Sequence, residues 1–292
     1  MNSDNTRQGV YYALTAYIFW GVVPIYFKWV DHVSPWEILS HRVIWALILL
    51  LAILFWTKQL SELRVPLKLI PKLLVTSVLL AINWLVFIYA VVNNNIAETA
   101  LGYFINPLVS VFLGVVILRE YLRPLQWIAV AIAALGILGQ LIMFGRVPWI
   151  ALALAFSFGF YGLLRKNLGL HAIGGLAIET LLVVPFALAF LIWTGWQEKL
   201  AFGDHMPTDL LLMLGGFVTS FPLLCFAAAV KRLSLTTLGM FQYVAPSISL
   251  VLAIFVYHED FDPGRAITFI CIWIALAIFT FEAWAQHRRR PV

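Results

Sequence analysis

Residues 101–124 read LGYFINPLVSVFLGVVILREYLRP, and residues 238–263 read LGMFQYVAPSISLVLAIFVYHEDFDP. Both stretches begin with Leu-Gly and share the spacing Pro-x12-Glu-x3-Pro, at Pro107, Glu120 and Pro124 and again 139 residues later. Arginines flank Glu120, whereas histidine and aspartates surround the equivalent Glu259. Lys and Arg collect on the cytoplasmic side of membrane proteins. The reversed charge therefore indicates one unit that occurs twice, in opposite orientations within a membrane.

The composition is that of an integral membrane protein. Hydrophobic residues make up 63% of the 292 residues, charged residues only 11%, and the mean hydropathy is +0.94. A soluble domain has no surface that accommodates such a composition. The net charge of +5 is spread in small groups between apolar runs, which predicts contact with lipid headgroups and no nucleic-acid partner. Cys225 and Cys271 lie inside apolar runs and are predicted to be packing residues.

The apolar runs predict an all-α membrane protein with ten transmembrane helices. A bilayer core of about 30 Å requires roughly 20 apolar residues per helix. The first run is too long for a signal-peptide core and is expected to be a retained helix. The predicted spans are 9–29, 36–56, 73–92, 99–118, 125–143, 148–164, 175–193, 209–230, 236–256 and 265–285.

The distribution of Lys and Arg predicts the orientation. With ten spans, 14 of these residues fall on the side of the termini and 4 on the opposite side, and Arg42 lies within the second span. Both termini are therefore expected to be cytoplasmic.

Five helices per unit is an odd number, so a duplicated unit reverses its direction in the membrane. We predict a first repeat at 9–143 and a second at 148–285. The pair Trp20-Gly21 in the first predicted helix matches Phe158-Gly159 in the sixth, which supports the duplication.

Trp20-Gly21, the run from Leu101 to Pro107 and the paired Glu-x3-Pro elements resemble the EamA branch of the drug/metabolite transporter superfamily. The resemblance runs nearly end to end. It implies an inner-membrane permease of ten helices in two inverted five-helix repeats that works by alternating access. It does not imply a substrate, because relatives carry amino acids, other metabolites or drugs.

Charged residues within a predicted span are candidates for function, because each costs at least about 2.5 kcal/mol to insert. Arg42 is expected in an outer vestibule, where it would attract a carboxylate or phosphate. Glu179 is expected in an inner vestibule, where it would bind a cation or proton. The two lie roughly 6 to 9 Å deep from opposite faces and are not expected to touch. The structural alternative is that Arg42 reaches the headgroups and that Glu37 pairs with His41.

Neutral candidates lie nearer the predicted midplane. Asn83 and Trp84 match Ser220 and Phe221 in the second repeat, which suits a central pocket; the alternative is that the polar pair joins helices by hydrogen bonds. Polar residues before Pro107 and Pro246 would satisfy the backbone at a kink or face a cavity. Trp20 would stack on a ring or simply pack. The predicted substrate-binding residues are Trp20, Arg42, Asn83, Trp84, Tyr103, Asn106, Glu179, Ser220, Gln242 and Tyr243.

The loop carboxylates Glu120 and Glu259 are expected to be structural, accepting hydrogen bonds from backbone amides at a helix start. The leading functional prediction is a secondary transporter for a small-molecule substrate, with coupling to protons or a counter-substrate. No Walker A sequence is present, and no cofactor, metal or catalytic residue is predicted. An intramembrane enzyme acting on a lipid-like substrate and a non-transporting scaffold are the alternatives.

Overall fold

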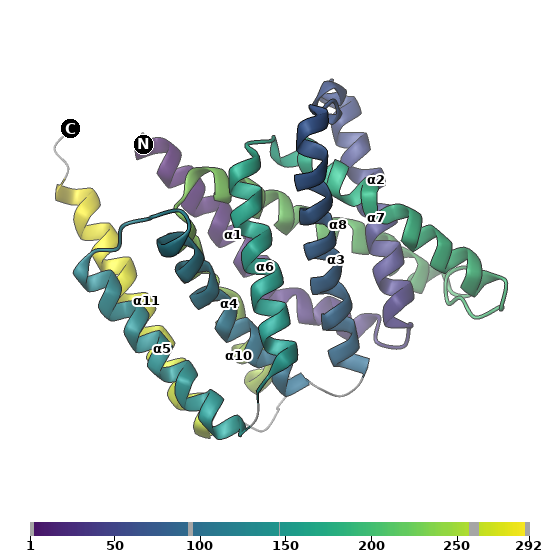
Figure 1. Cartoon of the computed structure of the whole chain (residues 1–292). Coiled ribbons are helices and arrows are strands. Elements are labelled where there is room, and N and C mark those ends of the chain that lie inside the picture. The colour runs from purple at the N-terminus through teal and green to yellow at the C-terminus, as the bar shows by residue number, and fades with distance from the viewer. Residues whose placement is uncertain (1–2, 93–95, 146, 257–262, 290–292) are drawn as a thin grey trace.

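The computed structural model describes residues 3–92, 96–145, 147–256 and 263–289, and these are almost entirely helical (Figure 1). The elements are α1 Ser3–Trp29, α2 Pro35–Trp56, η1 Leu60–Leu63, η2 Leu67–Leu69, α3 Ile70–Val92, α4 Ile96–Val116, α5 Pro124–Phe144, α6 Trp149–Leu168, α7 Ala172–Gly195, α8 Met206–Arg232, α9 Leu235–Phe241, α10 Val244–Phe255 and α11 Pro263–Arg289.

The ten predicted spans are all present, the ninth as two helices. Within the described ranges, seven helices are long and apolar enough to cross a membrane, and two shorter apolar helices lie in α4 and α11. The chain turns at Gln242 and Tyr243 between α9 and α10. Pro246 has no amide to donate to the Gln242 carbonyl one turn back, which accounts for the break. The equivalent Pro107 lies inside the continuous helix α4.

The helices of the two halves of the chain interlock. The helix α1 packs against α8 and α10, and its counterpart α6 packs against α3 and α4. The helix α2 packs against α7 and α8, and α5 runs alongside α11 (Figure 1). Each helix thus finds a principal partner in the other half. The repeat boundaries 9–143 and 148–285 stay a prediction, with which this packing agrees.

The same close approach occurs twice at equivalent glycines. A Cβ atom added to Gly21 would lie 2.7 Å from Cβ of Ile248, and one added to Gly159 would lie 2.7 Å from Cγ1 of Val109. Both partners lie two residues after a proline of the repeated pattern. Only glycine lets the helices approach this closely, as is usual between membrane helices.

An aromatic cluster forms the centre of the bundle. The Trp20 and Phe158 rings, predicted to be equivalent, contact each other with centroids 5.8 Å apart. Both also contact Phe226 of α8, at 5.9 and 5.1 Å. Contact between equivalent residues means that the axis relating the two halves passes close to this pair.

Both termini lie on one side of the bundle, here called the termini side, and the opposite side is the far side (Figure 1). On the termini side, the Glu120 carboxylate accepts hydrogen bonds from the backbone amides of Leu235 and Thr236, at 2.7 and 2.8 Å. The expectation that Glu120 binds amides at a helix start is confirmed, and the helix is α9 of the other half. Lys166 lies 3.8 Å from the same carboxylate. Glu259 lies outside the described residues.

Two more glutamates link the halves in the same way. Glu62 of η1 accepts a hydrogen bond from the Gly174 amide at the start of α7, on the termini side. On the far side, Glu37 accepts hydrogen bonds from the amides of Ala201 and Phe202. The alternative that pairs Glu37 with His41 holds only as an electrostatic interaction, because the carboxylate binds these amides and the His41 ring stacks on Phe202 at 4.5 Å.

Replacing Glu120 with Ala should lower the free energy of unfolding by about 1–3 kcal/mol, because it leaves the buried Leu235 and Thr236 amides unpaired. Glu120→Gln, which keeps one carbonyl acceptor, should fall between wild type and Ala. Thermal unfolding in detergent measures the effect. The matched control is Tyr121→Ala at an 85% exposed side chain, and an Ala variant no less stable than this control would contradict the prediction.

Candidate functional site

The most unusual polar side chain in the bundle is that of Arg42. It lies seven residues after α2 begins at Pro35, roughly 10 Å along the helix from the far side. Its Nε donates a hydrogen bond to Thr219 Oγ1 of α8, at 2.8 Å. The guanidinium carbon lies 5.3 Å from the centroid of the Phe27 ring and 5.9 Å from that of the Trp84 ring. Arg42 is thus held by α1, α3 and α8 and does not reach out to headgroups.

Two further aromatic residues extend this arrangement. The Phe87 ring lies 6.1 Å from Phe27 and 6.5 Å from Tyr103 of α4. Tyr103 is close enough to Arg42 for an electrostatic interaction, and its side chain is 48% exposed. We call Phe27, Arg42, Trp84, Phe87, Tyr103 and Thr219 the Arg42 cluster. It brings together three of the predicted site residues: Arg42, Trp84 and Tyr103.

Room for Arg42 comes from a glycine on α8. A Cβ atom at Gly215 would lie 2.9 Å from Arg42 Cγ and 2.7 Å from the Tyr26 hydroxyl. That hydroxyl donates to the Leu211 carbonyl, so it is already engaged. The missing side chain at Gly215 lets α2 and α8 approach while Arg42 lies between them.

Arg42 has no negative partner among the residues that the structure describes. Its single hydrogen bond there is to the neutral Thr219, and the two Nη groups donate to no described atom. A lone cation in a membrane-spanning helix is costly, and aromatic faces offset only part of the cost. The Nη groups are therefore free to bind an anion.

Glu179 lies in a different and fully paired environment. Only 1% exposed, its carboxylate accepts hydrogen bonds from Thr76 at 2.8 Å and Tyr161 at 3.2 Å, and it lies 3.6 Å from Arg165. Arg165 also donates to the carbonyls of His171 and Ala172. The structure thus places Glu179 in a buried ion pair between α6 and α7, and not in an open inner vestibule.

Arg165 is the residue that the sequence analysis missed. The predicted sixth span ends at residue 164, which assigned Arg165 to a cytoplasmic loop. In the structure α6 continues to Leu168 and Arg165 is 3% exposed. The sequence signal that could have revealed Arg165 was Tyr161. It lies one helical turn before Arg165 and donates a hydrogen bond to the same Glu179 carboxylate.

Three other predicted site residues, Asn83, Gln242 and Trp20, have their partners outside the Arg42 cluster. Asn83 donates to the Leu154 carbonyl at 3.0 Å and to Ser157 at 2.9 Å, which joins α3 to α6 as the structural alternative expected. Gln242 exchanges hydrogen bonds with Ser110 of α4. Trp20 belongs to the central aromatic cluster.

Three predicted residues hold buried polar atoms without a hydrogen-bond partner among the described residues. These atoms are the Asn106 carbonyl oxygen, the Ser220 hydroxyl and the Tyr243 hydroxyl. Buried polar groups are normally paired, so unpaired ones are expected where water or a ligand binds.

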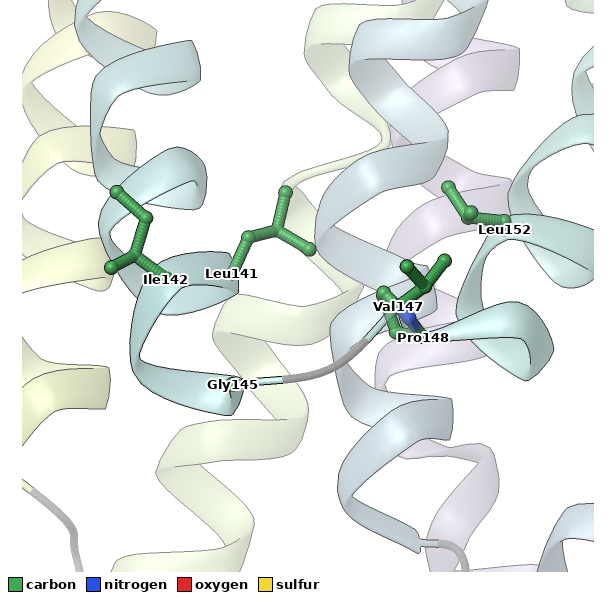
Figure 2. A pocket seen from close by; sticks show the side chains of 6 residues that line it. All are labelled: Leu141, Ile142, Gly145, Val147, Pro148 and Leu152. Atoms are coloured by element: carbon green, nitrogen blue, oxygen red, sulfur yellow. The ribbon is translucent and has the colours of Figure 1, made fainter.

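A surface pocket of about 500 Å³ lies where α5 ends and the chain enters α6 (Figure 2). Its lining is apolar and none of it is a predicted site residue: Leu141, Ile142, Gly145, Val147, Pro148 and Leu152. It contributes nothing to the Arg42 cluster.

Comparison with known proteins identifies the fold. The model of the EamA-like transporter family matches residues 7–142 and again residues 147–281. The chain belongs to the EamA-like transporter family. The resemblance noted in the sequence is confirmed, as are the two-repeat fold and the membrane location that it implies.

Relatives of this EamA protein match it over nearly its whole length. A Vibrio cholerae protein named as an uncharacterized transporter is 46% identical, covering 99% of this chain and 97% of its own. Protein RarD of Escherichia coli is 45% identical, with 99% of both chains covered. A solved crystal structure at 19% identity superposes with a TM-score of 0.74 over 97% of this chain and 99% of its own, which supports the fold alone.

Replacing Arg165 with Met should lower the free energy of unfolding by about 3–5 kcal/mol, because the buried Glu179 loses its cation. The double variant Arg165→Met with Glu179→Leu should recover most of that loss. Denaturant titration in detergent gives both values. A double variant as unstable as the sum of its single variants would show that the two residues act independently.

Proposed function

We propose that this protein is a secondary transporter that moves a small metabolite across a bacterial inner membrane by alternating access, without catalysis. The Arg42 cluster is the observation that carries the proposal. It presents free cationic donors inside a bundle, between helices of both halves of the chain. The charge of Glu179, by contrast, is already paired with Arg165.

The same proposal includes an orientation. The 14 Lys and Arg that the sequence assigns to the termini side support a cytoplasmic position for both termini, also when the buried Arg165 is left out of the count. Arg42, nearer the far side, then lies in the outer half of the membrane. The proposed site combines Arg42, Trp84 and Tyr103 with the unpaired polar atoms of Asn106, Ser220 and Tyr243.

Purified protein in proteoliposomes tests transport directly. Counterflow of labelled small organic acids should exceed that of protein-free vesicles, and Arg42→Gln should lower it at least about tenfold, which corresponds to one lost charged hydrogen bond. Arg64→Gln, at an exposed loop position, is the control. The assay also separates the alternatives. An intramembrane enzyme would convert the labelled compound into a product, and a scaffold would leave all of the labelled compound outside the vesicles.

For energy coupling, we propose Glu179 as the proton carrier. Protonation would neutralise the Glu179 carboxylate, which would weaken its ion pair with Arg165 and so the contact between α6 and α7. Glu179→Gln, which mimics the protonated state, should abolish accumulation driven by a proton gradient and spare counterflow exchange. Uptake with and without an imposed gradient separates the two, and unaffected accumulation would reject this role.

A further inference from the structure

The charges of the Arg42 cluster indicate which kind of substrate it takes. We propose that the cluster binds an organic monoanion, a carboxylate attached to a flat apolar body, and that it excludes zwitterions, cations and dianions. This inference rests on the proposed transport function and deepens it by naming the substrate class.

The free donors of Arg42 have the geometry that a carboxylate needs. Arg42 Nε is held by Thr219 at 2.8 Å, which fixes one edge of the guanidinium and leaves the Nη edge free. Two parallel N–H groups on one planar edge match the two oxygens of a carboxylate. Phe27 and Trp84 lie near the guanidinium, at 5.3 and 5.9 Å, and limit its rotation.

The charge of the Arg42 cluster matches that of a monoanion. Arg42 contributes one positive charge, and no described carboxylate forms an ion pair with it. A bound monoanion would neutralise the site. A phosphate monoester, with close to two negative charges, would leave an excess charge in a poorly solvated region, which is costly.

The amino group of an amino acid would lack a partner at the cluster. An ammonium group inside a bundle needs a carboxylate, several carbonyl oxygens or free aromatic faces, and the Phe27 and Trp84 faces already lie against the Arg42 guanidinium. The described polar side chains that interact with Arg42 carry hydroxyls, those of Thr219, Tyr26 and Tyr103, and none is a carboxylate. The Thr219 hydroxyl is already bonded to the Gly215 carbonyl. A zwitterion would therefore bring an uncompensated cation next to Arg42.

The apolar part of the ligand follows from the aromatic residues. Tyr103 is 48% exposed. Its ring contacts the Phe87 ring, which in turn contacts the Phe27 ring. Tyr103 also interacts electrostatically with Arg42. A ring or other flat apolar group joined by a short linker to a carboxylate would contact both.

A matched series of ligands tests the inference without any transport assay. Phenylacetate, phenylalanine, phenethylamine, phenylacetamide and phenyl phosphate share a phenyl ring and carry different charges. Titration calorimetry on the detergent-solubilised full-length protein should give the lowest Kd for phenylacetate. We expect each other compound to bind at least about tenfold more weakly, the effect of one lost charged hydrogen bond.

Variants assign the effect to Arg42. Arg42→Gln should weaken phenylacetate binding about tenfold or more, Arg42→Lys should restore part of it, and Arg64→Gln should leave it unchanged. Thermal unfolding without ligand verifies that each variant is folded. Because the ligand series on the wild-type protein needs no variant, an unfolded Arg42 variant still leaves a decisive measurement.

The outcomes that would overturn this inference differ from those that would refute the transport function. Phenylalanine or phenyl phosphate binding as tightly as phenylacetate would overturn the inference, and so would the absence of any binding in the series. Phenylacetate binding unaffected by Arg42→Gln would also overturn it. Selective binding without any flux in proteoliposomes would instead refute the transport function and leave the site intact, whereas flux of other solutes without anion binding would do the reverse.

Discussion

Helices in lipid gain little from burying apolar surface against one another, so close packing and polar contacts must hold this bundle together. The protein meets this constraint by joining each half to the other. Glycines such as Gly21 and Gly159 bring helices of different halves together, and glutamates of the first half accept hydrogen bonds from backbone amides of the second. A backbone amide is a donor that no substitution except one to proline removes. The interface therefore depends mainly on the glutamates themselves.

The two charges inside the predicted spans illustrate opposite solutions to the cost of burial. Glu179 is compensated by Arg165, Thr76 and Tyr161, so its site is complete without a ligand. Arg42 is compensated by neutral and aromatic groups only. Both side chains lie at comparable depths from opposite sides of a pseudo-symmetric bundle, so position alone does not explain the difference. One of the two sites is thus complete without a ligand, and this difference supports the proposal that the substrate binds at Arg42.

The sequence predicted the ten spans and the two repeats because hydrophobic length and spaced Pro-Glu-Pro elements are local properties of the chain. It also selected Arg42, Trp84 and Tyr103, which the structure brings together. It could not predict that Arg42 bonds to Thr219, 177 residues later, because periodicity gives the face of a helix and not its neighbour. It missed Arg165 for another reason. A hydropathy window ends at the first charge, whereas a paired charge is tolerated inside the helix.

The exposure of each polar contact to water decides whether it can break during the proposed alternating-access cycle. Glu62 and Glu120 keep 14% and 13% of their side chains exposed, so water replaces the amide donors as the halves separate on the termini side. The Arg165–Glu179 pair is 3% and 0% exposed, and its separation would leave two bare charges. The helices α6 and α7 should therefore move as one unit for as long as Glu179 is charged. In the proposed alternating-access cycle, the termini side would open where η1 meets α7 and where Glu120 meets α9, and protonation of Glu179 would let α6 and α7 move apart.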